Sequence, residues 1–275
     1  MSGADFWAPT ARDVARVTGP DARSYLQSQL SQDLAPVAVG SSVWSFLLQP
    51  TGKVTALVRV TVASDEELLV DVDAGSGAEV IARLERFRIR VKADIEALDW
   101  RAIAVRGPSG SSVVPPAEGV VAPAWWGPES GYDLLGPEVV PPPNVDEGDA
   151  DRLEAARIEA GWPAMGAEVT DQTIPGELGP VVFRSVSFTK GCYPGQELVE
   201  RMDSRGAAAP RQLRRVRATG GGALVVGATV TADGRDVGRV TSAAGSVALA
   251  LVGRAVDPGS PVAVDGVTAT VEAIA

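Results

Sequence analysis

The stretch SVWSFLLQPTGKVTALVRVTVA, residues 42–63, decides the fold class. Two apolar runs rich in β-branched and aromatic residues flank the short segment PTGK, where Pro50 and Gly52 suit a tight turn. This pattern predicts a β-hairpin, so two neighbouring strands are expected to run antiparallel. Further strands are predicted for LLVDVD (68–73), RVKADIEAL (90–98) and DWRAIAVRG (99–107).

Helices are mixed with these strands. Apolar side chains recur at helical spacing over about residues 20–32, in GSGAEVIARLERFRI (75–89) and in ADRLEAARIEAG (150–161), where Gly161 is a typical helix stop. Residues 107–148 are rich in Pro and Gly, and we expect a loop there that leads into the acidic N-terminus of a helix. Hairpin-connected strands with interspersed helices favour an α+β fold over a doubly wound parallel sheet.

The C-terminal part has a different pattern. From about residue 213, short β-rich runs are separated by Asp-Gly turns at 233–234 and 265–266, which predicts a small closed all-β domain. We therefore expect a first domain that covers residues 1–210 and a β-barrel that covers residues 211–275. The first domain is expected to contain two subdomains, of about residues 1–100 and 101–210.

Composition excludes several classes of function. The chain has 275 residues and a net charge of −10, which disfavours nucleic acids and anionic membranes as partners. We expect no signal peptide, because the first residues lack a basic segment followed by an apolar one, and no apolar run is long enough to span a bilayer. We therefore expect a cytoplasmic protein. It has no histidine, which excludes Cys–His and Ser–His–Asp catalysis and His-ligated metals. The single cysteine excludes an intramolecular disulfide and a four-cysteine metal site, and we expect no metal held by this chain alone.

That cysteine, Cys192, lies in the segment KGCYPGQE (190–197). A free cysteine is often a buried packing residue. Here, however, Gly191 and the Pro-Gly pair that follows give an irregular backbone that can hold a side chain at the surface. Lys190 places a cation nearby that would favour the thiolate, and Glu197 could oppose it. From the residues alone, a packing cysteine and a working thiol both remain open.

Arginines concentrate after this segment. They form either a solvated connector to the β-rich domain or a site for an anionic ligand, since guanidinium groups pair well with carboxylates. The arginines in question are Arg201, Arg205, Arg211, Arg214, Arg215 and Arg217. No phosphate-binding loop accompanies them: GPSGSS lacks both the strand–loop–helix context and the Lys-Ser/Thr pair of a P-loop.

The segment KGCYPGQE resembles the signature of the YgfZ family of folate-binding proteins, relatives of the glycine-cleavage T-protein, an aminomethyltransferase. The segments GPDARSYLQSQLSQDL, LLQPTGKV, RLERFRIRVKADIE and RIEAGWPAMGAEVTDQTIPGELG are similar to family segments and occur in the family's order. The resemblance covers nearly the whole chain. It implies an aminomethyltransferase-like α+β folate-binding domain, with antiparallel sheets and helices, followed by a small C-terminal β-barrel.

The resemblance also implies a function. The family role is tetrahydrofolate-dependent assembly or repair of iron–sulfur clusters, so we expect folate and iron–sulfur client proteins or assembly factors as partners. The family cysteine and lysine correspond to Cys192 and Lys190, our candidate catalytic residues. GPESGYDL is similar to the T-protein segment that contacts the pterin, which places Glu129 there. A carboxylate suits this role because it accepts two hydrogen bonds from the pterin ring.

Other residues are assigned to folate binding with less specific support. Arg157 falls on the arginine of a T-protein segment, although it could instead be a helix arginine that pairs with an acid. We also assign Gln196, Glu197 and Arg201 to the folate site, where nearby arginines would meet the glutamate tail.

One departure separates the two activities of this superfamily. Aminomethyl transfer needs an acidic residue just after the first hairpin turn, and here Ala56 and Leu57 stand in that position. An aminomethyl or other one-carbon transferase therefore remains only the alternative function, and it would need another carboxylate such as Asp71 or Asp73. A third possibility is a folate-binding scaffold whose cysteine only packs.

Overall fold

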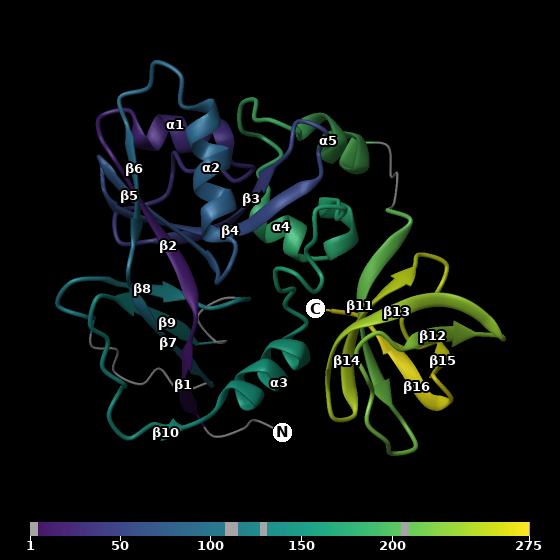
Figure 1. Ribbon diagram of the computed structural model, residues 1–275. Helices are drawn as coiled ribbons and strands as arrows, with labels where there is room; N and C mark the ends of the chain where they lie inside the picture. Colours follow the sequence, from purple (N-terminus) through teal and green to yellow (C-terminus); the bar gives the residue numbers. More distant parts are fainter. Residues whose placement is uncertain (1–4, 108–114, 127–130, 205–208, 275) are drawn as a thin grey trace. The chain divides into compact units, whose positions relative to one another are not determined.

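The computed structural model describes residues 5–107, 115–126, 131–204 and 209–274 (Figure 1). The chain divides into two compact units, each of which is described by itself. The first unit comprises Met1–Pro50, Thr55–Leu153 and Arg184–Pro194. The second unit comprises Thr51–Val54, Glu154–Phe183 and Gly195–Ala275.

The first unit contains a five-stranded sheet in the order β3-β4-β5-β2-β6. The predicted hairpin is confirmed as β3 (Ser42–Leu48) and β4 (Val54–Ser64), and β5 (Glu67–Asp73) pairs antiparallel with β4. β2 (Arg12–Thr18) pairs antiparallel with β5 and with β6 (Asp94–Leu98). Helices α1 (Ala22–Gln29) and α2 (Gly77–Phe87) pack on this sheet through their apolar faces.

A second five-stranded sheet in the same unit has the order β10-β1-β7-β9-β8. Its strands are β1 (Phe6–Thr10), β7 (Arg101–Arg106), β8 (Val120–Pro123), β9 (Tyr132–Gly136) and β10 (Asp146–Glu147). Three of these, β8, β9 and β10, lie in the stretch that we expected to be a loop, so that expectation was wrong there. The strands are short and separated by Pro and Gly. The pairing of β9 with β7, of β8 with β9 and of β10 with β1 supplies the strand signal that the local sequence lacks.

The second unit ends in a closed barrel with the strand order β11-β14-β13-β12-β15-β16. Valine and alanine side chains fill its core. Both predicted Asp-Gly turns are confirmed, since Asp233, Gly234, Asp265 and Gly266 all have positive φ angles, of 49°, 72°, 44° and 88°. The strands are β11 (Arg211–Ala218), β12 (Thr229–Ala232), β13 (Arg235–Ala244), β14 (Val247–Gly253), β15 (Pro261–Val264) and β16 (Val267–Glu272).

Helical elements precede the barrel. They are α3 (Ala150–Ala160), the 3-10 helix η2 (Pro175–Leu178), α4 (Val181–Ser185) and α5 (Gln196–Ser204). α3 ends before Gly161 as predicted; the φ of this glycine is +73°, and a Cβ there would lie 2.6 Å from Cγ2 of Ile274. The α+β fold class with a terminal barrel is thus confirmed. No helix in the described ranges is long and apolar enough to cross a membrane.

Candidate functional site

The backbone that follows α1 prepares the position of the candidate thiol. The helix ends at Gln29, and Leu30 adopts an extended conformation that forms a bridge to Leu47 of β3. The Ser31 amide donates to the carbonyl of Phe46 at 3.1 Å, and the Phe46 amide donates to Ser31 Oγ at 2.8 Å. The residues after α1 are therefore held against the sheet rather than left as a free loop.

A second segment of the first unit is fastened to these residues. The Ser187 amide donates to the carbonyl of Ser31 at 2.9 Å, and Ser31 Oγ donates to the carbonyl of Ser185 at 2.5 Å. Nε2 of Gln32 donates to the carbonyl of Arg184 at 2.8 Å. These bonds fix the start of residues 187–194, here named the thiol loop.

Lys190 makes the next attachment of the thiol loop. Its Nζ donates to the carbonyls of Gln27, Leu30 and Gln32, at 2.5, 2.6 and 3.1 Å. Burial lowers the pKa of Lys190 to about 8, and the nearby carboxylate of Asp33 opposes this effect. An ammonium group has three N–H donors, so none remains for the sulfur of Cys192. The side chain of Lys190 is therefore committed to backbone carbonyls rather than to a hydrogen bond with the sulfur.

Cys192 itself is exposed. The next residue, Tyr193, is buried, and its ring centroid lies 5.2 Å from Lys190 Nζ. Gly191 has no atom within 4 Å of the position that a Cβ would occupy. The thiol thus lies in open space between two anchored residues, and it is not a packing residue of the core.

This exposure predicts rapid alkylation. Because no fold surrounds the sulfur, iodoacetamide is expected to modify native Cys192 within about threefold of its rate in urea-unfolded protein, whereas a buried thiol reacts far more slowly. Mass spectrometry of timed samples measures both rates. The single cysteine makes the signal unambiguous, and Cys192→Ser serves as the blank. A native rate lower by about 100-fold would contradict the exposed position.

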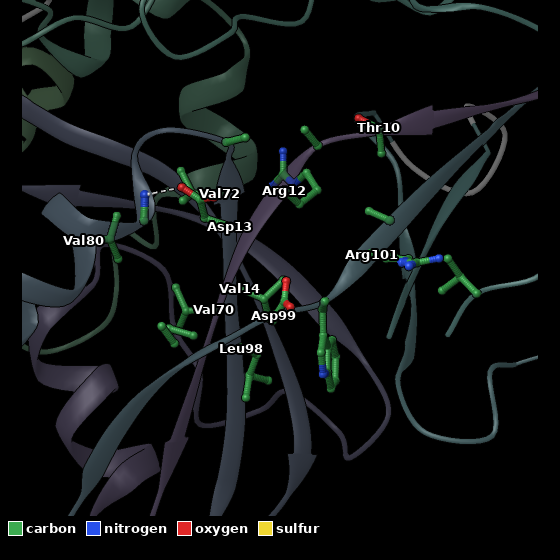
Figure 2. Close-up of a pocket in the computed structure, with 18 of the residues that line it drawn as sticks. Thr10, Arg12, Asp13, Val14, Val70, Val72, Val80, Leu98, Asp99 and Arg101 are labelled. Carbon is green, nitrogen blue, oxygen red and sulfur yellow. Dashed lines mark hydrogen bonds between the residues drawn. The ribbon is translucent and has the colours of Figure 1, made fainter. Parts of the chain in front are cut away.

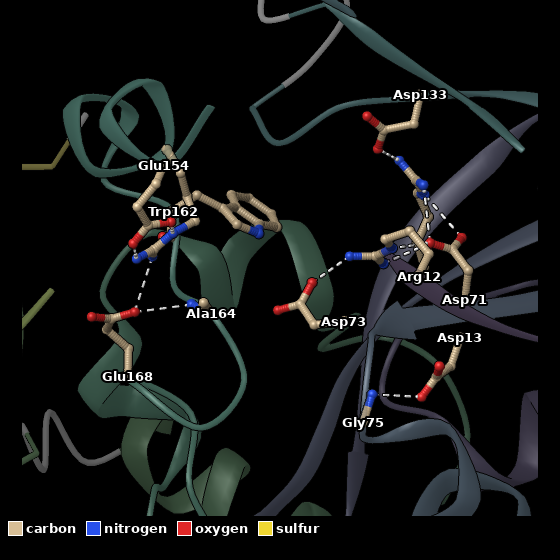
Figure 3. A network of polar contacts seen from close by, with 12 residues as sticks. Arg12, Asp13, Asp71, Asp73, Gly75, Asp133, Glu154, Trp162, Ala164 and Glu168 are labelled. Carbon is tan, nitrogen blue, oxygen red and sulfur yellow. Dashed lines mark hydrogen bonds and ion pairs between the residues drawn. The ribbon is translucent and has the colours of Figure 1, made fainter. Parts of the chain in front are cut away.

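Away from the thiol loop, charged side chains form a buried network in the first unit (Figure 3). Arg59 of β4 is fully buried; its Nε and Nη2 donate to Asp71 at 3.0 and 2.9 Å, and its Nη1 donates to Asp133 at 2.7 Å. Arg12 also binds Asp71, through Nε at 2.8 Å, and pairs with Asp73. Arg106 donates to Asp133 at 2.8 Å.

The ion pairs of this network also determine which carboxylates could act as a general acid or base. Burial alone would raise the pKa of Asp133, but Arg106 and Arg59 hold it well below its usual range. Asp71 is bound by two guanidinium groups, so it is already committed to ion pairs. Ala56 and Leu57, which stand where the transferase needs an acid, are buried. These positions offer no free carboxylate to a one-carbon transferase.

Arg157 occupies the second unit and binds acids there. Its Nε and Nη2 donate to Glu154 at 2.8 and 2.6 Å, and its Nη1 donates to Glu168 at 3.0 Å. The carbonyl of Trp162 and the hydroxyl of Ser242 accept at 2.5 and 2.7 Å. All five N–H donors of this buried side chain are used within the protein, which favours the acid-pairing interpretation over contact with folate.

Three of the other folate-site predictions lie on α5. Gln196 is half-buried in its first turn, while Glu197 and Arg201 are exposed and, at i and i+4, share one face. Glu129 and Arg205 lie outside the described residues. Arg211, Arg215 and Arg217 pair with the carboxylates of Glu177, Glu272 and Glu159 and so resemble structural arginines.

A pocket of about 1110 Å³ opens elsewhere in the first unit (Figure 2). Val14, Val70, Val72 and Leu98 contribute apolar walls, and charged side chains such as Asp99 lie among them. None of the predicted site residues that the structure describes lines it. Among the described residues, no three His, Cys, Asp or Glu side chains group as a metal site.

Sequence reasoning missed Gln27, Ser31 and Gln32, which hold the thiol loop, and the ion network around Arg59. Gln27, Ser31 and Gln32 gave no signal, because each acts mainly through backbone atoms or across a long sequence separation. Arg59 did give one, since it is the single charged residue in a strand of mostly apolar residues. A charged residue in such a strand requires a buried partner.

Two family models and a solved structure are similar to this chain. Residues 12–120 match the GCVT N-terminal domain model, and residues 211–274 match the model of the CAF17 C-terminal β-barrel domain. A solved aminomethyltransferase T of the glycine cleavage system from Bartonella henselae is similar, with a TM-score of 0.85 and 19% identity over 99% of this chain and 86% of that one. That likeness shows the shared fold.

Curated relatives are also similar in sequence. An uncharacterized protein of Haemophilus influenzae is 30% identical over 203 residues, which are 74% of this chain and 70% of that protein. A tRNA-modifying protein YgfZ from Enterobacter is 27% identical over 74% of this chain and 67% of its own length. A mitochondrial iron–sulfur cluster assembly factor IBA57 homolog from Chaetomium globosum is 28% identical over 79% of this chain. The matched region covers 58% of the length of that homolog.

Proposed function

Because the chain belongs to the YgfZ family of the glycine-cleavage T-protein superfamily, we propose that it is a folate-binding factor that supports the assembly or repair of iron–sulfur clusters in client proteins. The observation that carries this proposal is the exposed thiol of Cys192 on a loop that is anchored at both sides. A relative named for iron–sulfur cluster assembly supports it.

The chemistry of one exposed thiolate suits this role. A single thiolate can be a shared, transient ligand to a cluster whose other ligands come from a partner, or it can exchange with a partner's disulfide. The cluster is then cargo rather than a resident group. Histidine, which hydrolytic thiol enzymes use as a base, is absent from the sequence.

Tetrahydrofolate is the proposed small-molecule partner. The superfamily fold supports folate binding, and a carboxylate such as that of Glu129 has the right chemistry to accept hydrogen bonds from the pterin ring. When bound, the folate would supply a one-carbon carrier or would hold the active shape. Arg157 is saturated by internal bonds and is not needed for this proposal.

Other functions have less support. Relatives are also named tRNA-modifying proteins, yet the net charge of −10 does not favour direct RNA binding. A one-carbon transferase would need an acid where Ala56 and Leu57 are buried, and Asp71 is already held by two arginines. We therefore assign the thiol, rather than a general acid, as the working group.

Calorimetric titration with tetrahydrofolate tests the folate part of the proposal. Wild type and Cys192→Ser are expected to bind equally, since the thiol is exposed and is not assigned a folate contact. Glu129→Ala is expected to bind at least about tenfold more weakly, because two hydrogen bonds to a charged acceptor are lost. Glu118→Ala, at an exposed acid of the described residues, is the control. Absence of binding by the wild type would contradict the proposal.

A further inference from the structure

We propose that Lys190 is a positioning residue that fastens the thiol loop to the end of α1, and that it serves Cys192 through position rather than through charge. This inference rests on the proposed role of Cys192 as the working group. It concerns how the same site is built, and it assigns Lys190 a different task from the thiolate activation that its sequence position suggests.

The end of α1 is a ready acceptor for a cation. The last carbonyls of a helix have no partner within the helix, and they form the negative end of its dipole. α1 carries no basic residue in its own last turn. Lys190 supplies that cation from 160 residues later in the chain, as its bond to the carbonyl of Leu30 shows.

The hydrogen bonds of the Lys190 ammonium group leave it with little electrostatic influence on the thiol of Cys192. Three N–H donors meet three carbonyl oxygens, so the charge is directed toward the end of α1 and lies beside Asp33. Cys192 is exposed, and water screens the interaction between a surface thiolate and a charge that does not contact it. The effect of Lys190 on the position of the thiol loop, in contrast, does not depend on the dielectric constant of the surroundings.

That positional effect follows from the spacing of the anchors. Lys190 is clamped two residues before Cys192, and Tyr193 is buried one residue after it. Ser187, three residues before the lysine, is held by its amide bond to Ser31. With anchors on both sides, the backbone at Cys192 has few conformations, and the sulfur is presented to a partner in one direction.

The test compares Lys190→Met with Lys92→Met, a change at an exposed lysine of the same unit. Two readouts are taken without folate or any client, so their outcome is independent of the proposed function. Hydrogen exchange of residues 187–194 is expected to accelerate at least about tenfold in Lys190→Met only. The pH midpoint of Cys192 alkylation is expected to move by less than about half a pH unit in both variants.

Either of two results would overturn the inference. A midpoint that rises by half a unit or more in Lys190→Met shows that the cation activates the thiol. Unchanged exchange in the thiol loop shows that the clamp does not hold it. If Lys190→Met does not fold, Lys190→Gln, which keeps one donor group and removes the charge, is subjected to the same two measurements.

Discussion

Replacing Arg59 with methionine is expected to lower the free energy of unfolding by about 3–5 kcal/mol, because it leaves two buried carboxylates without their shared partner. Arg59 is fully buried and binds both Asp71 and Asp133. Its guanidinium also lies 5.2 Å from the ring centroid of Trp44. Urea unfolding followed by tryptophan fluorescence measures the loss.

Arg16→Met is the matched control. Arg16 lies on β2 of the same sheet and pairs with Glu67 at 3.2 Å and Glu96 at 3.8 Å, but these pairs are partly exposed. Such pairs contribute about 0–1 kcal/mol, so this variant is expected to stay near the wild type. Equal losses in the two variants would contradict a special role for the buried network.

The pH dependence of the Arg59 effect provides a second check. The pKa of Asp133 is held below its usual range in the folded state, so its contribution is present above the unfolded value of about 3.9 and is lost as the pH falls further. The stability difference between wild type and Arg59→Met is therefore expected to shrink at pH 3 relative to pH 7. A constant difference would place the effect in packing rather than in charge.

The elements that the sequence predicted are those whose signals are local. The hairpin turn at Gly52 and the Asp-Gly turns of the barrel are defined by two to four adjacent residues, and the structure has them as expected. β8 and β9 were missed because their strand character comes from pairing: β9 pairs with β7, whose partner residues lie 27–35 positions away in sequence, and β8 pairs with β9. A pattern read over a few adjacent residues does not reveal a strand partner that is distant in sequence.

The candidate site divides in the same way. The segment around Cys192 was recognisable as a string, yet the acceptors of Lys190 lie 158–163 residues earlier, so the task of the lysine could not be read from its neighbours. For Arg157 the sequence left two alternatives, and only the positions of Glu168 and Ser242 favour one of them.

Cys192→Ser is expected to abolish function in cells while leaving the protein folded. If the sulfur is a cluster ligand or an exchanging thiol, a hydroxyl cannot replace it, because serine is neither a soft ligand nor a redox group. Activity of an iron–sulfur client enzyme in cells that lack the endogenous protein is expected to stay at the level of an empty vector. Because Cys192 is exposed, the free energy of unfolding is expected to change by less than about 0.5 kcal/mol.

Gly191→Ala is the control that shows whether the loss of function in Cys192→Ser is specific to the sulfur. It alters the adjacent exposed residue, and an added Cβ meets no atom within 4 Å, so near-complete function is expected. If Cys192→Ser supports the client enzyme fully, the thiol is not the working group and the proposed function loses its chemistry. If Gly191→Ala fails as well, the loop's backbone rather than the sulfur is what the partner requires. Loss in the serine variant alone assigns the function to one exposed thiol, which the clamp at α1 presents from a loop that the rest of the unit holds in place.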